Sequence, residues 1–300
     1  MRVYIQLPSS GAGRWIYKGF YSAWEELGYS VNYFTEMKDI VDRQDFYLMT
    51  HDGFGESNFN VIQRAAKTFL FVQPIKFPYP WGAHPNFVSA CNPEIIKQLS
   101  EMKKVIKWTF VNYKDNKEVE SNYALWKDVN IFPLAFDSVN YELIEEEPIW
   151  DVCFVGGAAN NGFNEKVKIM NVILTEFTKT ELKYAFFVNK YLSHEDENKL
   201  LSLSKVALNI HDAYQRKLQL DTNERTFKSL GLTGCLVSDQ NKQIDNLFPQ
   251  VKMSNDPKEM IQCVTDLINN KSLNEIKKES RNAILNGHTY VDRVKRMLEL

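Results

Sequence analysis

The sequence is poor in the residues that build disulfide frameworks and metal centres. It has only four cysteines in 300 residues, and none of them forms a Cys-x-x-Cys pair. Cys153 and Cys235 stand within apolar runs, which predicts buried free thiols in a reducing compartment. No Asp-x-Asp pair and no histidine-cysteine cluster stands out as a set of metal ligands. We therefore expect a protein that works without a metal ion or a resident cofactor.

Long apolar runs and an excess of basic residues are also missing. The opening MRVYIQLP is typical of a first strand rather than of a secretion signal, and no segment suggests a membrane span. The expectation is a cytoplasmic protein. The 36 Lys and Arg against 38 Asp and Glu give a net charge of -2, which argues against tight, non-specific nucleic-acid binding. The compact basic cluster of the first half is Lys103, Lys104 and Lys107.

The sequence does contain a regular alternation of strand and helix patterns. A β-rich run at 2–7, a small-residue loop and a helical pattern at 14–28 open the chain, and the same succession returns at 150–177. Two similar halves predict an α/β protein with two Rossmann-like domains that face each other across a cleft. The expected bounds are 1–140 for the N-terminal domain, 141–285 for the C-terminal domain, and 286–300 for a last helix that packs back on the N-terminal domain.

Other elements follow from local patterns. The predicted strands are 29–34, 45–50, 68–73, 86–90, 105–111, 182–188 and 206–210. The predicted helices are 94–102, 194–204, 257–269, 273–285 and 290–300. The segment 213–220 is expected to be a polar loop, and 245–249 a short turn.

The first small-residue loop, 8–13, contains Gly11 and Gly13. It lacks both the Gly-Lys-Ser/Thr end of a P-loop and the full GxGxxG pattern, so by itself it is a weak signal for a nucleotide. Two interpretations stay open: a tight turn that packs helix on strand, or a contact with the acceptor side of a ligand.

The stretch 221–239, DTNERTFKSLGLTGCLVSD, organises the rest of the chain. It starts with residues that favour helix N-caps, and Arg225 stands in the first helical turn. A helix N-terminus beside an arginine is suited to an anion, above all a phosphate. The apolar run after Gly234 predicts a buried parallel strand. The plain alternative for Arg225 is a surface ion pair with Glu224 or Asp221.

Candidates for proton transfer stand after a strand of the first half. Asp52 is the preferred general base and His51 the second choice, because both follow a strand and precede a glycine. Gln73 and Trp81 are expected to line the acceptor site. The alternatives are that Asp52 and Gly53 form a simple turn, that His51 is a core or capping residue, and that the aromatics fill space.

The second half resembles the CgeB-like and related glycosyltransferases of the two-Rossmann GT-B type, with a glycosyltransferase family 1-like C-terminal domain. The motifs that carry this resemblance are FVGG at 154–157, ALNIH at 207–211, NERTF at 223–227 and GLTGCLVSD at 231–239, with HTYVDRV at 288–294 and the crossover-like FPLAFD at 132–137. The phage enzymes that glucosylate hydroxymethylated DNA bases have a similar C-terminal layout. The likeness covers about half of the chain.

The resemblance implies transfer of a hexose or pentose from a nucleotide-diphosphate sugar, such as a UDP-sugar, to a hydroxyl acceptor without a metal. Gly156 and Gly157 would then let the diphosphate approach the backbone, Arg225 would pair with its charge, and His211 would border the nucleotide. The other donor-side residues that the motif implies are Asn223, Glu224, Thr226 and Lys228. Lys228 is a departure, because related enzymes commonly have a Glu there that holds the donor ribose. Either Glu224 substitutes for it or the donor is held differently.

Three functions remain open from the sequence. The first is a transferase that acts on a glycan, a lipid-linked saccharide or a protein. The second is a phage-type transferase that acts on modified DNA bases, which the near-neutral charge disfavours. The third is a non-catalytic protein that keeps the fold for binding, which the presence of Lys228 favours.

Overall fold

The computed structural model divides the chain into two compact units. Unit 1 is Met1–Pro133 together with Tyr290–Leu300, and unit 2 is Leu134–Thr289. The residues that the structure describes are 1–7, 13–40, 45–54, 59–83, 88–157 and 165–300. Each unit is built on a parallel sheet with helices, so both are Rossmann-like α/β domains. Among the helices described, none is long and apolar enough to cross a membrane.

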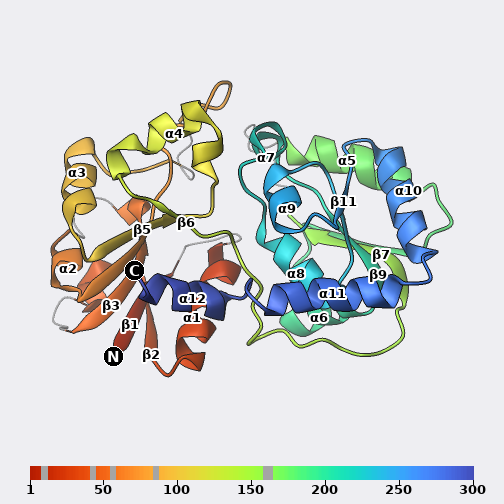
Figure 1. The fold of residues 1–300 in the computed structure, drawn as a ribbon, viewed down its shortest axis with the longest axis horizontal. Coiled ribbons are helices and arrows are strands. Elements are labelled where there is room, and N and C mark those ends of the chain that lie inside the picture. Colours follow the sequence, from red (N-terminus) through yellow and green to blue (C-terminus); the bar gives the residue numbers. More distant parts are fainter. Residues whose placement is uncertain (8–12, 41–44, 55–58, 84–87, 158–164) are drawn as a thin grey trace. The chain divides into compact units, whose positions relative to one another are not determined.

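Unit 1 contains a six-stranded sheet in the order β2-β1-β3-β4-β5-β6 (Figure 1). All of its strand pairs are parallel. The strands are β1 (Arg2–Gln6), β2 (Ser30–Phe34), β3 (Phe46–His51), β4 (Lys67–Phe71), β5 (Val105–Thr109) and β6 (Asn130–Ile131). The helices of the unit are α1 (Gly13–Glu26), α2 (Phe59–Arg64), α3 (Pro93–Glu101), α4 (Lys117–Tyr123) and α12 (Tyr290–Leu298). Short 3₁₀ turns lie at Met37–Ile40, Asp52–Phe54, Tyr113–Asp115 and Ala124–Trp126.

Aromatic side chains fill the core of unit 1. Trp24 of α1 packs against Phe69 of β4, and Phe20 of α1 packs against Trp108 of β5. The last helix, α12, lies beside α1, where the ring of Tyr290 contacts that of Phe20 at 4.8 Å (Figure 1). The C-terminal helix is therefore part of the N-terminal unit, although it is distant in sequence.

Unit 2 contains a five-stranded parallel sheet in the order β11-β10-β9-β7-β8. Its strands are β7 (Trp150–Gly156), β8 (Tyr184–Val188), β9 (Ser204–Asn209), β10 (Leu236–Ser238) and β11 (Lys252–Met253). Its helices are α5 (Lys166–Phe177), α6 (His194–Ser202), α7 (Ala213–Leu218), α8 (Glu224–Leu232), α9 (Lys242–Leu247), α10 (Pro257–Ile268) and α11 (Leu273–Leu285). As predicted, the strand after Gly234 is parallel and buried.

The order of the strands reverses direction in the middle of this second sheet. From β7 the chain goes first to β8 on one side and then to β9 on the other side. In open parallel sheets, ligands bind at the carboxyl ends of the strands where such a reversal occurs. The place of interest in unit 2 is therefore the edge formed by the ends of β7 and β9.

Two local predictions were wrong because short helices carry little periodic signal. The segment expected to be a polar loop contains α7, which begins at a capping box formed by Asp212 and Gln215. The segment expected to be a short turn overlaps α9, whose N-cap Asn241 accepts hydrogen bonds from two backbone N–H groups. The expected strand at 86–90 lies partly outside the described residues, and 88–90 are not a strand.

Candidate functional site

Three strand ends of unit 2 bring polar residues together at the carboxyl edge of the sheet. β7 ends at Gly156, β9 ends at Asn209, and β10 is followed by Asp239. α8 starts next to them, with Asn223 as its N-cap residue. Because β7, β9 and β10 are parallel neighbours, their ends meet at one edge although they are far apart in sequence.

Arg225 lies at the point where the strand order reverses. Its Nε donates to the carbonyl of Val155 at 2.5 Å, and its Nη1 donates to Oδ1 of Asn209 at 3.0 Å and to the carbonyl of Ile210 at 3.4 Å. Its guanidinium also covers the ring of Phe154 at 4.8 Å. Arg225 thus bridges the ends of β7 and β9, and the structure gives it neutral acceptors rather than the surface carboxylates of a plain ion pair.

Gly156 leaves space that the arginine uses. A Cβ on Gly156 would lie 2.8 Å from Cζ of Arg225 and closer still to Nη2, so a side chain at this position would displace the guanidinium. A Cβ on the neighbouring Gly157 would meet only Oδ1 of Asn189, at an ordinary 3.9 Å. Of these two positions, 156 is therefore the one where steric contact requires a glycine. The following loop, 158–164, lies outside the described residues.

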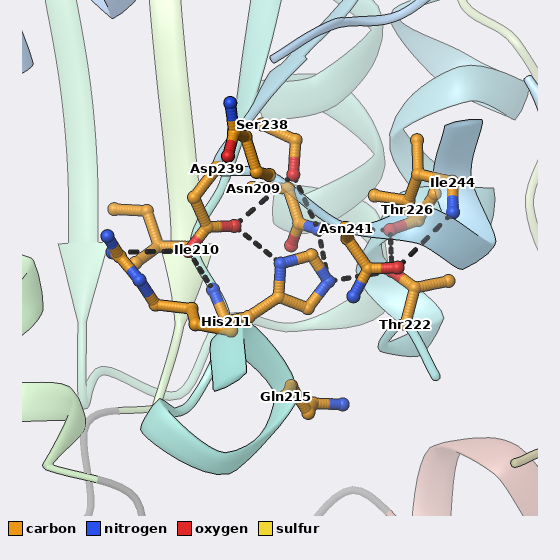
Figure 2. Close-up of polar contacts among 12 residues, drawn as sticks. Asn209, Ile210, His211, Gln215, Thr222, Thr226, Ser238, Asp239, Asn241 and Ile244 are labelled. Carbon is orange, nitrogen blue, oxygen red and sulfur yellow. Dashed lines mark hydrogen bonds and ion pairs between the residues drawn. The ribbon is translucent and has the colours of Figure 1, made fainter. Parts of the chain in front are cut away.

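His211 follows β9 and is completely buried. Figure 2 shows its polar contacts. Its Nδ1 is 2.5 Å from Oδ1 of Asp239, and its Nε2 is 2.8 Å from the hydroxyl of Thr222. Its backbone N–H donates to the other oxygen of Asp239. Both ring nitrogens are occupied, so in this structure His211 connects strand ends and the start of α8 rather than presenting a nitrogen to a ligand.

The first turn of α8 carries further predicted residues. The side-chain oxygen and nitrogen of Asn223 are buried and have no hydrogen-bond partner within the described part of the chain. Thr226 is buried and hydrogen-bonded to Thr222 at 2.6 Å. The carboxamide of Asn223 is therefore an unused polar group beside Arg225, whereas Thr226 belongs to the internal network.

A second cation, Lys166, stands at the N-terminus of α5. It is nearly buried, and its Nζ pairs with Asp212 at 3.0 Å. Burial lowers the pKa of Lys166, and the charge of Arg225 lowers it further, against the opposing effect of Asp212. Burial likewise lowers the pKa of Arg225, against the carboxylates of Glu224 and Asp212. The two cations therefore interact at this edge with each other and with the carboxylate of Asp212, and the sequence pattern did not indicate Lys166 or Asp212.

Lys228 is buried in an ion cluster rather than exposed at a ligand site. Its Nζ lies 2.9 Å from Glu197 of α6 and 3.4 Å from Glu224, and it sits over the ring of Tyr141 at 5.1 Å. The hydroxyl of Tyr141 donates to Glu197 at 2.6 Å. Burial raises the pKa of Glu224 despite Lys228. Against the effect of burial, Lys228 and Tyr141 hold the pKa of Glu197 below its usual range.

The predicted residues of unit 1 are partly brought together. Asp52 follows β3 and is completely buried, where its Oδ2 accepts the backbone N–H of Gln73 at 2.9 Å and its Oδ1 accepts Nε2 of Gln73 at 3.3 Å. Burial raises the pKa of Asp52 to about 7, although the hydrogen bonds from Gln73 oppose the rise. A carboxyl group that exchanges a proton near neutral pH is thus held at the carboxyl edge of the first sheet.

His51 is half-buried at the end of β3. Its Nδ1 accepts the backbone N–H of Gly53 at 3.1 Å, so the proton of the neutral ring is on Nε2. Burial lowers the pKa of His51, which favours this neutral form. The ring is therefore arranged as a hydrogen-bond donor at Nε2.

The other acceptor-side candidates lie elsewhere in unit 1. Gly13 is the first residue of α1, and Trp81 lies in the turn that Phe77 and Gly82 close by antiparallel bridging. Gly11 falls outside the described residues.

Sequence reasoning missed Asn209, Lys166 and Glu197, because each acts on a residue that is distant in the chain. ALNIH drew attention to its histidine, whereas the side chain that reaches Arg225 is the asparagine two positions earlier. A buried asparagine at the end of an apolar strand was the one signal that could have indicated it.

Comparisons with known proteins identify the fold. Residues 162–299 match the family described as "Glycosyl transferase-like". No curated protein matches the sequence. The T4 phage BGT structure with its UDP-glucose substrate has a TM-score of 0.54 at 10% identity, with 100% of both chains covered. An alpha-glucosyltransferase in complex with UDP-glucose and DNA containing an abasic site has a TM-score of 0.58 at 12% identity, with 96% of both covered. AviGT4, a glycosyltransferase involved in avilamycin A biosynthesis, has a TM-score of 0.54 at 12% identity. That match covers 100% of this chain and 96% of the AviGT4 chain.

This chain has the GT-B fold. The resemblance to GT-B glycosyltransferases that the motifs of the second half indicate is therefore confirmed, together with the prediction of two Rossmann-like domains. The family match at 162–299 covers most of unit 2 together with the α12 segment of unit 1.

Proposed function

We propose that this GT-B protein is a glycosyltransferase that moves a sugar from a nucleotide-diphosphate donor to a hydroxyl acceptor. The observation that carries the proposal is the position of Arg225, which bridges the ends of β7 and β9 where the strand order of the second sheet reverses. That edge is where parallel α/β sheets bind ligands. The glycosyl transferase-like match of 162–299 and the UDP-glucose complexes of two structural neighbours support it.

The charges at this edge suit the leaving group. As the bond between the anomeric carbon and the diphosphate breaks, negative charge grows on the diphosphate, and fixed donors that meet it lower the barrier. Arg225 and Lys166 supply two positive charges, and the start of α8 supplies backbone N–H groups. Asp212 holds Lys166 when no anion is present, so the diphosphate would replace a carboxylate as its partner.

On the acceptor side, we propose Asp52 rather than His51 as the general base. The hydrogen bond from Gly53 leaves the neutral His51 ring with a proton on Nε2, which makes it a donor. Asp52 has a pKa raised to about 7 by burial, a value suited to taking a proton from a hydroxyl near neutral pH. Because Asp52 is buried, an acceptor must reach it where Gln73 now binds.

The proposed acceptor is a glycan, a lipid-linked saccharide or a protein, and no metal ion is proposed for the reaction. A modified DNA base is the less favoured acceptor. Two lysines of the basic cluster in the first half are committed to the fold: Nζ of Lys104 donates to the carbonyl of Ala65 at 2.9 Å, and that of the buried Lys107 donates to the carbonyl of Ser100 at 3.0 Å. Among the hydrogen bonds described, Lys103 is the one lysine of the three whose Nζ does not donate to a backbone carbonyl.

Calorimetric titration of the full chain with UDP, ADP and GDP tests the donor site. Arg225→Ala should lower the affinity for the tightest-binding diphosphate at least tenfold, since a charged hydrogen bond contributes about 1.5–3 kcal/mol. Arg281→Ala is the matched control, because Arg281 also donates to carbonyls of unit 2, at Leu232 and Thr233. Unchanged affinity after loss of Arg225 would remove the assignment of this site.

An assay for hydrolysis of nucleotide sugars, measured as the free sugar released, separates an enzyme from a non-catalytic binding protein. Asp52→Asn should lower transfer to an acceptor by about 100-fold or more while the donor affinity stays the same. Asp45→Asn is the control, because Asp45 is exposed at the opposite end of β3. A fully active Asp52→Asn protein would exclude Asp52 as the base, and binding without any turnover would favour the non-catalytic function.

A further inference from the structure

Asn209 fixes the plane of the Arg225 guanidinium. Its side chain is completely buried at the end of β9, and its Oδ1 accepts Nη1 of Arg225 at 3.0 Å. The carbonyl of Val155 holds Nε of the same guanidinium. Two acceptors on different nitrogens fix a planar group, and the remaining nitrogen, Nη2, is the one nearest to Gly156. Without Asn209, the guanidinium would keep one strong anchor and could rotate about it.

The amide of Asn209 holds the arginine in only one of its two orientations. Its oxygen accepts a hydrogen bond, whereas its NH₂ group would repel the N–H groups of Arg225. In the structure Nδ2 points the other way and donates to the hydroxyl of Thr226 at 3.0 Å. Nδ2 also lies 3.2 Å from Nε2 of His211 and 3.4 Å from the hydroxyl of Ser238. The orientation of the amide therefore depends on a group of acceptors, of which Thr226 is the nearest.

A chain of hydrogen bonds determines that Thr226 accepts (Figure 2). Its hydroxyl is 2.6 Å from that of Thr222, which is 2.8 Å from Nε2 of His211, and Nδ1 of His211 is 2.5 Å from Oδ1 of Asp239. Although burial opposes ionisation, contact with His211 holds the pKa of Asp239 below its usual range. An ionised carboxylate only accepts, so Nδ1 of His211 carries a proton. Nε2 lies 3.2 Å from Nδ2 of Asn209, which only donates, so Nε2 is an acceptor and Thr222 donates to it. Thr222 then accepts from Thr226, and Thr226 accepts from Asn209. Every bond from Arg225 to Asp239 donates in the same direction.

We propose that Asn209 is a positioning residue that orients Arg225 toward the donor diphosphate, with its amide held by the hydrogen-bond chain that ends at Asp239. This inference rests on the proposed function, because it concerns the arginine assigned to the diphosphate. In this proposal Asn209 acts through Arg225, whose Nη1 it binds.

A double-mutant cycle on diphosphate affinity tests the inference in the full chain. UDP, ADP and GDP are titrated by calorimetry, and the tightest of them is the probe. Asn209→Ala should weaken it about tenfold in the wild-type background, the size expected for one charged hydrogen bond. In an Arg225→Lys background, a cation remains but the planar guanidinium that Asn209 holds is lost. There Asn209→Ala should change diphosphate affinity less than twofold. An equal loss in both backgrounds would overturn the inference, because it would mean that Asn209 acts through the fold in general.

Thr226→Val tests the chain separately and keeps the inference falsifiable if Asn209→Ala does not fold. Valine has the shape of threonine but cannot accept from Asn209, so the probe should bind about tenfold more weakly, again only when Arg225 is present. Thr233→Val is the control, since Thr233 is equally buried but its hydroxyl donates to the carbonyl of Leu201, outside the chain of donors. Equal affinities for Thr226→Val and Thr233→Val would overturn the role of the chain.

The proposed function and the inference fail in different ways. If none of the three diphosphates binds the wild-type protein, the donor site itself is wrong and the inference falls with it. If the probe binds and Arg225→Ala weakens it, but Asn209 and Arg225 prove additive, only the inference is overturned.

Discussion

Gly156 and Arg225 share one space: the guanidinium of Arg225 fills the volume that a side chain on Gly156 would need, with Cζ 2.8 Å from the position of such a Cβ. The two residues are 69 positions apart, yet Arg225 is anchored by the carbonyl of Val155, which immediately precedes Gly156. The glycine of FVGG is thus explained by an arginine of a different motif. The two motifs form a single structural unit at the edge of the second sheet.

Exchange of Gly156 for alanine should displace Arg225 and weaken the bound nucleoside diphosphate by about 10- to 100-fold, because the arginine loses the hydrogen bonds that orient it. Gly157→Ala is a sharp control, since its Cβ would have only an ordinary contact with Asn189. Calorimetry with UDP gives the affinities, and a thermal melt shows that both variants fold. Equal affinities of the two variants would contradict the steric relation.

Removal of the Asp212 charge should strengthen diphosphate binding. Asp212 competes with the phosphates for Lys166, so Asp212→Asn should lower the dissociation constant for UDP about three- to tenfold at low salt, and Lys166→Met should raise it by at least as much. Asparagine is also a good N-cap, so the start of α7 should survive the change. Titrations at two salt concentrations provide the test, and a weaker complex for Asp212→Asn would count against Lys166 as a phosphate ligand.

Loss of the Lys228 charge should destabilise unit 2. Lys228→Met leaves the carboxylates of Glu197 and Glu224 buried together without their cation, which should cost about 3–5 kcal/mol of unfolding free energy. The double variant Glu197→Gln with Lys228→Met removes one of these charges and should recover part of the loss. Urea unfolding curves measure both. An unchanged unfolding free energy for Lys228→Met would show that the cluster contributes little to stability.

The pKa of Asp52 predicts a stability that falls with pH. Its pKa is raised by burial from 3.8 to about 7, so between these values the folded protein binds more protons at this site than the unfolded chain does. The contribution of Asp52 to stability is complete below about pH 4 and is lost as pH rises through about 7, with a slope of at most about 1.4 kcal/mol per pH unit. Unfolding free energies at several pH values, compared with Asp52→Asn, provide the measurement. A wild-type slope equal to that of the variant would show that the carboxyl group is not shifted.

The same group also predicts how turnover depends on pH. A general base must be ionised, so acceptor transfer should rise as pH increases through about 7 and then level off. Initial rates at saturating donor, measured across this range, should show the rise. A rate that is constant from pH 5 to pH 8 would argue against Asp52 as the base.

Much of the architecture follows from local sequence patterns. Alternating apolar runs and helical stretches predicted most strands and the long helices of both units, and Leu273–Leu285 has the predicted bounds. The short helices α7 and α9 were missed because six residues are too few for a period of 3.6 to be visible, and what defines them is a cap and a contact in the folded state. The motifs of the second half predicted the GT-B fold, which the comparisons confirm.

The sequence by itself determined the alternation of elements, the two similar halves and the presence of an arginine at the start of a helix late in the chain. Only the tertiary structure decided which side chains surround that arginine. Asn209, Val155 and Gly156 meet Arg225 because parallel strands end at a common edge, and Lys228 meets Glu197 because α6 packs against α8. Such contacts join residues that no local periodicity relates, since hydrogen bonds and ion pairs depend on distance in space and not on spacing along the chain.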